Sequence, residues 1–202
     1  PNFLNAEQVS ISAEIRVAPP APNPGFTIGY FSGSKSHARD FDVAAGALAQ
    51  FLSRHPDARL VVAGILDIPD MLNPLWSQID RLPFMDYLSL QSRISEVDLN
   101  IVPLQDNPFT DGKSELKYVE ASAVSTLTLA SPAEVFSRLI TDGHNGFLAA
   151  AESWLSQIEL VASLKQPQRK KISHAALRHV VGTYTPEAQV SNLESVLGRF
   201  VR

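Results

Sequence analysis

Apolar and polar residues follow one another along the middle of the chain in blocks typical of strands followed by helices. An apolar run at 26–31, FTIGYF, precedes a segment at 39–55 whose apolar residues have the spacing of an amphipathic helix. The pair begins again with the run ARLVVAG at 58–64. Further strands are predicted at 80–84, 98–104, 126–131 and 146–149, and further helices at 68–78, 86–95, 114–124 and 133–140.

Strands that alternate with helices predict a parallel sheet covered by helices on both faces. Parallel neighbours need a crossover connection, and a helix packed on the sheet supplies it. The expected fold class is therefore α/β, a doubly wound, Rossmann-like parallel sheet. Residues after 150 are expected to be helical, with helix starts at Pro167 and Pro186.

The segment before the first predicted strand has a different composition. It ends in APPAPNPG, whose prolines and glycine favour an extended linker or an irregular edge, so regular structure is expected to begin after residue 25. This divides the chain into a linker at 1–25, a main domain at 26–185 and a terminal helix at 186–202.

Composition excludes several classes of function. The 202 residues are 45% hydrophobic and 19% charged, as in a globular protein with a sizeable core. A formal net charge of −4 with scattered basic residues disfavours nucleic acid as a partner. The lack of cysteine excludes disulfides and thiol catalysis, and the five histidines do not cluster as metal ligands.

Location can be inferred from what the sequence lacks. No apolar run approaches the roughly twenty residues that span a bilayer, and no signal peptide is visible. We therefore expect a cytoplasmic protein with no transmembrane segment. The basic run KQPQRKK at 165–171 could bring it to the inner membrane as a peripheral protein, or could form a solvated helix face.

Two loops that follow predicted strands carry candidate chemistry, because ligands of this fold class bind at the carboxyl ends of strands. The loop SGSKSHARDF at 32–41 has a glycine that lets backbone approach a phosphate and basic residues that neutralise the phosphate charge. The alternative is a polar loop whose helix is capped by Asp40 or a nearby serine. In TDGKSELKYVEA at 110–121, Gly-Lys-Ser resembles a P-loop. That motif needs a glycine where this chain has Asn107, so only a helix start suited to an anion remains.

Glu120 is the unusual residue of the helix that follows the second loop. It is the only charge in YVEASAV, and a carboxylate among small apolar residues is costly unless it has a partner such as the hydroxyls of a ribose. Lys113, Lys117 and Glu120 are expected along one side of this helix. The alternative is a glutamate at its solvent edge. A third loop, TDGHNGFL at 141–148, predicts by itself only a tight turn into a strand.

Taken in order, these segments resemble the C-terminal half of GT-B glycosyltransferases of the large retaining group 1 family, which uses nucleotide-sugar donors. SPAEVFSRLITDGHNGFLA at 131–149 is similar to the family's proline-glutamate helix and the turn after it. Gly33 and Arg39 match the glycine and basic residue of its first phosphate loop, and Glu120 matches its second glutamate, which holds the donor ribose. PNFLN at 1–5 resembles the start of the family's second domain.

The resemblance implies that this chain is the donor-binding half of a hexosyltransferase. Such an enzyme moves a sugar from a nucleoside diphosphate sugar to an acceptor hydroxyl with retention, without metal or other cofactor, here in bacterial surface polysaccharide or glycan synthesis. A missing N-terminal domain would bind the glycan or lipid-linked acceptor, and the helix at 186–202 would cross over to it, so the isolated chain is expected to be inactive. With no catalytic residue and no metal ligand assigned, the resemblance implies donor binding by Gly33, Ser34, Lys35, Arg39, Lys113, Ser114 and Glu120.

Departures from the family pattern leave alternatives open. Gly112 stands where the family has its first glutamate, Ser34 stands where an arginine follows the loop glycine, and STL at 125–127 replaces Gly-x-Pro. The Lys-Ser-x-x-Lys form at 113–117 resembles some bacterial members, in which basic residues could face the diphosphate instead. The alternatives are a GT-B nucleotide-sugar epimerase and a non-catalytic nucleotide- or partner-binding module.

Overall fold

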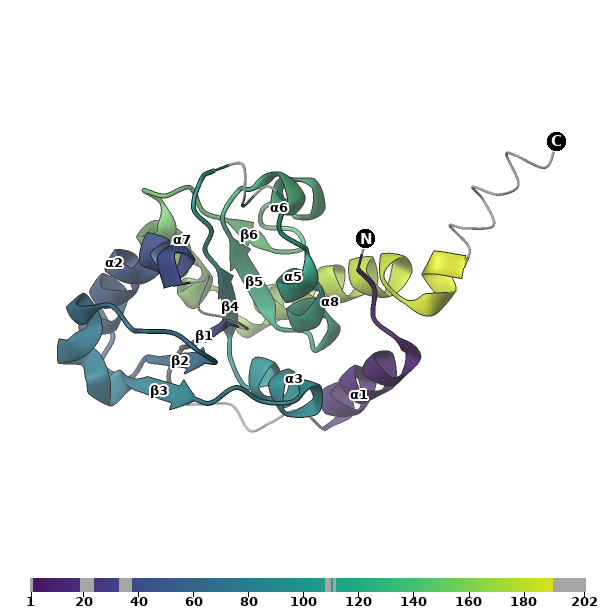
Figure 1. The fold of residues 1–202 in the computed structure, drawn as a ribbon, viewed down its shortest axis with the longest axis horizontal. Coiled ribbons are helices and arrows are strands. Elements are labelled where there is room, and N and C mark those ends of the chain that lie inside the picture. The colour runs from purple at the N-terminus through teal and green to yellow at the C-terminus, as the bar shows by residue number, and fades with distance from the viewer. Residues whose placement is uncertain (1, 19–23, 33–37, 108–109, 111, 191–202) are drawn as a thin grey trace.

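A six-stranded parallel sheet forms the centre of the protein (Figure 1). The structure is a computed structural model, and it describes every residue except 1, 19–23, 33–37, 108–109, 111 and 191–202. The strand order is β3-β2-β1-β4-β5-β6, and every neighbouring pair is parallel, which confirms the predicted doubly wound class. The strands are β1 (Thr27–Phe31), β2 (Arg59–Ala63), β3 (Ile79–Leu82), β4 (Leu99–Val102), β5 (Leu127–Ala130) and β6 (Phe147–Leu148).

Helices cover both faces of the sheet. On one side α2 packs against α7 and the 3₁₀-helix η2, and on the other α1, α3 and α5 pack together, with α8 against α5 (Figure 1). None of the described helices is long and apolar enough to cross a membrane. The helices are α1 (Ala6–Val17), α2 (Ala38–Arg54), η2 (Asp70–Gln78), α3 (Tyr87–Ser95), α5 (Leu116–Ala123), α6 (Glu134–Leu139), α7 (Trp154–Ser163) and α8 (Gln166–Thr183).

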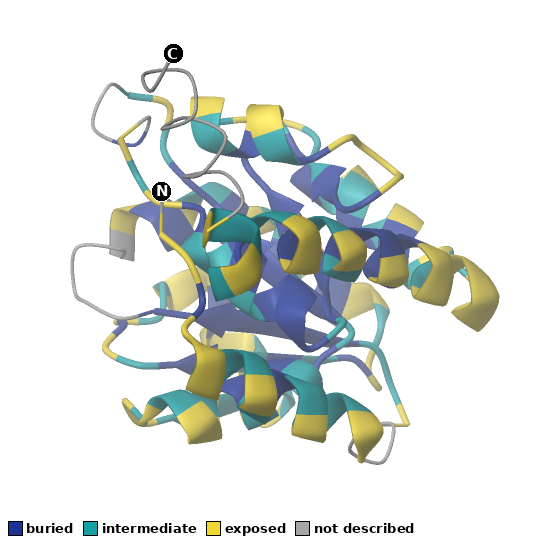
Figure 2. Cartoon of the chain, turned by 90° about the vertical axis from the view of Figure 1, so that its right-hand side faces the viewer, coloured by how far each residue is buried: buried dark blue, intermediate teal, exposed yellow. Residues whose placement is uncertain are grey.

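The core lies on both faces of the three central strands. Every residue of β1, β4 and β5 is buried, as expected for strands of a parallel sheet that is covered on both sides. The predicted apolar stripe of α2 faces this core, with Leu48, Phe51 and Leu52 at most 1% exposed. Figure 2 shows the buried strands inside and exposed residues along the outer faces of the helices.

The N-terminal segment corrects one prediction, because residues 6–17 form a helix where an irregular linker was expected. α1 begins with a capping box: Asn5 Oδ1 accepts from Gln8 N at 2.8 Å, and Gln8 Oε1 accepts from Asn5 N at 2.9 Å. The prolines that suggested irregular structure come after Val17, so they do not oppose the helix itself. The assignment of 1–25 as an interdomain linker stays a prediction.

Other boundaries follow the sequence signals closely. Pro74 lies inside η2, which is a 3₁₀ element and not an α-helix, in accord with the irregular helix predicted there. Pro167 lies in the first turn of α8, and residues 186–190 are helical, as predicted for a helix start at Pro186. Residues 191–202 of the predicted terminal helix lie outside the described residues. The helix predicted at 114–124 begins two residues later, at Leu116.

Candidate functional site

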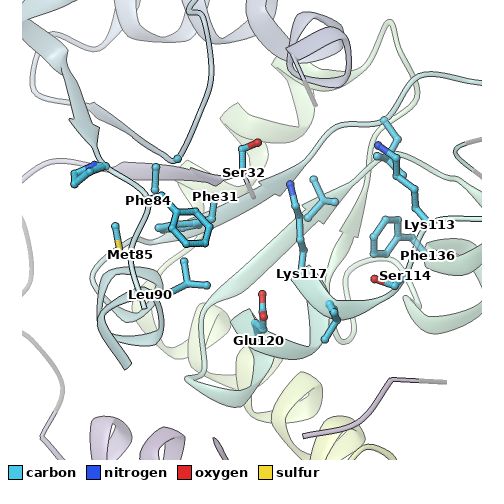
Figure 3. Close-up of a pocket in the computed structure, with 16 residues that line it drawn as sticks. Phe31, Ser32, Phe84, Met85, Leu90, Lys113, Ser114, Lys117, Glu120 and Phe136 are labelled. Atoms are coloured by element: carbon cyan, nitrogen blue, oxygen red, sulfur yellow. The ribbon is translucent and has the colours of Figure 1, made fainter. Parts of the chain in front are cut away.

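A cavity of about 430 Å³ opens at the carboxyl ends of the central strands. Phe31 and Ser32 reach it from the end of β1, Gly64 from the end of β2, and Lys117 and Glu120 from α5 (Figure 3). β1 and β4 are neighbours in the sheet although β2 and β3 lie between them in sequence, so the strand order reverses at this point. Ligands of doubly wound sheets bind at such a switch point.

Gly64 allows the backbone to pass close to the cavity wall. Its φ is +96°, and a Cβ at this position would lie 1.8 Å from the carbonyl oxygen of Ser32. Only glycine combines this conformation with so close an approach. The ends of β1 and β2 are therefore held side by side at the rim of the cavity.

Lys117 points into the cavity from the first turn of α5 (Figure 3). Its Nζ lies 4.6 Å from the centre of the Tyr30 ring. Within the part of the chain that the structure describes, this amine has no hydrogen bond, and no carboxylate oxygen lies within 4.0 Å of it. Burial, together with the charge of Lys113, lowers the pKa of Lys117 to about 8. A cation held by an aromatic face and not by a carboxylate is suited to an anionic ligand.

Glu120 faces the same cavity from the next turn of α5 (Figure 3). Burial raises the pKa of this carboxyl to about 7, and the charge of Lys117 opposes the shift only in part. Among the described residues, the Glu120 carboxylate makes no hydrogen bond and no ion pair. The structure thus places Glu120 in the cavity wall and not at an outer solvent edge.

Lys113 also lines the cavity, but its amine forms an ion pair with Asp40 of α2. The Asp40 side chain is 5% exposed, and its Oδ1 also accepts from Gln105 N at 3.2 Å. The expectation that Lys113 lies along α5 is wrong, because α5 begins at Leu116. Lys113 comes from the preceding turn, where its backbone N donates to Thr110 O at 3.1 Å.

The other predicted site residues differ in where they lie relative to the cavity. Ser114 lines the cavity beside Lys113, while Arg39 is exposed in the first turn of α2, where its carbonyl accepts from Gln105 Nε2 at 3.1 Å. Gly112 is exposed in the turn before α5. Among the residues described, no group of three His, Asp or Glu is arranged to hold a metal ion. Outside the described residues lie Gly33, Ser34 and Lys35.

An apolar wall of the cavity was not identified from the sequence. Phe84 and Met85 come from the loop between β3 and α3, and Leu90 comes from α3. In Figure 3 these three side chains lie on one side of Lys117, and Lys113 and Ser114 lie on the other. Phe84 is 68% exposed, and this large apolar residue at the end of the strand predicted at 80–84 is the sequence signal that points to this wall.

The Asp-Gly-x-Asn-Gly turn lies away from the cavity and fixes the helices behind it. Buried Asn145 accepts from Thr141 N at 2.7 Å and donates to Leu139 O at 2.9 Å and to Tyr118 Oη at 3.0 Å. The Tyr118 hydroxyl is also 3.2 Å from His179 Nδ1 of α8. The predicted tight turn is confirmed, and it contacts α5 at Tyr118, the residue next to Lys117.

A family model described as "Glycosyl transferases group 1" matches residues 25–165. Comparison with curated protein sequences gave no match. The C-terminal domain of the glycosyl transferase group 1 family protein LpcC from Francisella tularensis has a TM-score of 0.65 at 20% identity, covering 91% of this chain and 96% of that domain.

Two longer proteins have the same fold over nearly all of this chain. HepE from Anabaena, solved with UDP and glucose, has a TM-score of 0.70 at 18% identity, covering 98% of this chain and 55% of HepE. Sucrose-phosphate synthase from Thermosynechococcus elongatus has a TM-score of 0.75 at 14% identity, covering 100% of this chain and 52% of the synthase. The chain thus spans about half the length of these two proteins.

Proposed function

The chain belongs to the glycosyl transferase group 1 family, and we propose that it binds the nucleoside diphosphate sugar donor of a glycosyltransferase. The observation that carries this proposal is Lys117. Its ammonium faces a cavity at the switch point of the sheet, and no carboxylate in the described part of the chain lies within ion-pair distance. Support comes from the similar structure of HepE, which was solved with UDP and with UDP-glucose.

The diphosphate is proposed to bind beside Lys117 at the start of α5. Free amides at a helix N-terminus and the helix dipole favour negative charge there, and Ser114 adds a hydroxyl donor. Lys113 contributes less charge, because Asp40 already neutralises it. We propose further phosphate contacts by Gly33, Ser34 and Lys35, between β1 and α2, and by Arg39 in the first turn of α2.

The nucleoside is proposed to extend from the diphosphate along α5. Glu120, in its ionised form, can accept hydrogen bonds from the two ribose hydroxyls, and these replace the water that burial removes. The base then reaches the apolar wall of Phe84, Met85 and Leu90, which offers surface for a flat ring.

The proposed reaction is transfer of a hexose to an acceptor hydroxyl with retention and without a metal ion. Negative charge develops on the diphosphate as the bond to the anomeric carbon breaks, and Lys117 with the amides of α5 stabilises it where it forms. The acceptor is proposed to bind a further domain, because HepE and sucrose-phosphate synthase are about twice as long, so this chain alone should bind donor without transfer. A role in surface polysaccharide or glycan synthesis is supported by WaaG, a similar structure of a glycosyltransferase involved in lipopolysaccharide biosynthesis.

A second candidate is nucleotide binding without catalysis. It is favoured by Gly112, which brings no side chain to the place where the resembled family has a glutamate against the transferred sugar. The two candidates share the cavity and differ in turnover. An assay of the full-length protein for sugar transfer, and for epimerisation of a free nucleotide sugar, separates them.

Saturation-transfer NMR of the chain against a panel of UDP-, GDP- and dTDP-sugars tests donor binding directly. We expect saturation at base and ribose protons for at least one donor, since the base and ribose pack against the apolar wall and α5. Competition by the matching nucleoside diphosphate should remove the signal. Absence of saturation for every member of the panel would contradict the proposed function.

A further inference from the structure

The segment that precedes the sheet is tied to both ends of α5. At the start of α5, Asn2 N donates to Glu115 Oε1 at 3.2 Å, and Glu115 is the N-cap residue of the helix. At the other end, the Arg16 guanidinium donates to the carbonyl oxygen of Ala123, the last residue of α5. Residues 2–16 therefore run alongside α5 from its first turn to its last.

Contacts between these two ends keep the segment in place. Leu4 is 3% exposed, packs in the same hydrophobic cluster as Tyr118 and Val119 of α5, and donates its backbone N–H to Tyr184 O at 2.8 Å. Ile15 packs with the cluster that contains Ala121. The capping box makes α1 a well-formed helix, and α1 packs against both α3 and α5.

α5 depends on such contacts because little within it fixes its position. It has eight residues, too few for a stable isolated helix, and its N-cap residue makes no side-chain capping hydrogen bond. It also carries Lys117 and Glu120, whose charged forms both lose hydration in the cavity. Outward movement of α5 would return both groups to water, so contacts on the helix must oppose it.

We propose that residues 2–16 are a positioning strap for α5, which sets how deeply Lys117 and Glu120 reach into the cavity. Arg16 is its main positioning residue, since a cation that donates to the last carbonyls of a helix also interacts favourably with the helix dipole. Arg16 itself does not line the cavity. The proposal rests on the proposed function only for what the cavity binds.

Arg16→Ala in the 202-residue chain tests the strap, with amide hydrogen exchange of α5 and nucleotide affinity as the two readouts. We expect exchange in α5 to accelerate about tenfold relative to α7, because the opening of α5 becomes easier. Donor affinity should fall about fivefold to tenfold as the two charged groups lose their fixed depth. Arg16→Lys, which keeps a cationic donor, should restore both readouts in large part.

Val161→Ala in α7 is the control for a general loss of stability, since Val161 is fully buried in the cluster on the opposite face of the sheet. It should lower the melting temperature without selective exchange in α5. If Arg16→Ala does not fold, Asn5→Ala loosens the start of α1 more mildly and should give the same pattern. Unchanged α5 exchange in a folded strap variant, or the same α5 response in Val161→Ala, would overturn the strap. Failure of the unaltered chain to bind any nucleotide would overturn the proposed function and leave the exchange comparison valid.

Discussion

Lys117 and Glu120 lie one turn apart on α5, and the protein holds each in surroundings that disfavour its charge. Burial lowers the pKa of Lys117 to about 8 and raises that of Glu120 to about 7. Burial that disfavours the charged form of a group reduces the stability of the fold at any pH where that group is charged in the unfolded chain. Such a cost is typical of a binding site, because the ligand can supply the partners that the protein lacks.

Glu120→Gln should therefore stabilise the fold and weaken donor binding. The folded-state pKa is raised from 4.5 to about 7, so the folded chain binds more protons in this window and stability falls as pH rises through it. The variant does not undergo this loss. Its unfolding free energy, relative to that of the unaltered chain, should therefore rise by about 2 kcal/mol from pH 4.5 to about pH 7. Donor affinity should fall by about 1–2 kcal/mol, since an amide accepts a weaker hydrogen bond than a carboxylate.

Urea unfolding across this pH range and calorimetry of the donor measure the two effects. Glu152→Gln, at an exposed position that does not line the cavity, is the matched control and should change neither. Equal affinity of Glu120→Gln and the unaltered chain would show that Glu120 does not contact the donor.

At the scale of single residues, the sequence indicates Glu120 as a candidate site residue, because it is a lone charge in an apolar helix segment. The roles of Lys113 and Lys117 cannot be separated in the sequence, because the difference depends on Asp40, which lies far away in sequence and forms an ion pair with Lys113. A pattern within one helix contains no information about such a tertiary ion pair.

Secondary-structure elements show where the chain departs from ideal geometry. α5 ends in a Schellman motif, with Thr126 N donating to Ala121 O at 2.9 Å and Ser125 N to Ser122 O at 3.0 Å. The residue at the left-handed position is Ser125, with φ +64°, where glycine is usual. Gly-x-Pro in the resembled family corresponds to this stretch, so the departure noted in the sequence is a strained helix end.

Ser125→Gly should relieve this strain and raise the unfolding free energy by about 0.5–1 kcal/mol. Donor affinity should not change, because Ser125 does not line the cavity. Chemical denaturation followed by circular dichroism measures the gain. A loss of stability would show that another interaction of the serine outweighs its backbone strain.

Asn145→Ala should destabilise the protein without affecting the donor site directly. Asn145 is 6% exposed, and its removal leaves Thr141 N and Leu139 O without their side-chain partner. We expect a loss of about 2–4 kcal/mol in unfolding free energy, measured by urea titration. Donor affinity at low temperature should stay within about threefold of the unaltered chain, since the turn lies behind α5. A large loss of affinity in the folded variant would give this turn a direct role in binding.

Element types were predictable because the strand and helix periodicities are strong, and the prolines mark starts at 167 and 186 correctly. The helix at 6–17 is not predicted, because the prolines that follow it dominate the composition of the segment. Its signal is the Asn-x-x-Gln capping box at 5–8, which needs only local sequence.

On the scale of the whole molecule, alternation of strands and helices predicts a parallel sheet but not its strand order. Several orders are compatible with right-handed crossovers, and the order places the β1 and β4 ends together at the cavity. The apolar wall at Phe84 and Met85 also depends on that order, because β3 lies at the edge of the sheet. Resemblance to the family predicted the fold, and the arrangement of the cavity required the structure.

Calorimetric titration of the 202-residue chain with UDP-, GDP- and dTDP-sugars, with EDTA present, tests the central claim that Lys117 makes this cavity a donor site. The comparison uses the unaltered chain, Lys117→Met and the control Lys170→Met, which removes an exposed lysine of α8. The unaltered chain should bind at least one donor with a dissociation constant below about 1 mM, and Lys117→Met should bind it at least about tenfold more weakly. Lys170→Met should match the unaltered chain. Affinity of the unaltered chain should also fall as pH rises above about 8, where Lys117 loses its proton. Absence of heat for every donor, or equal affinity of Lys117→Met and Lys170→Met, would contradict the account.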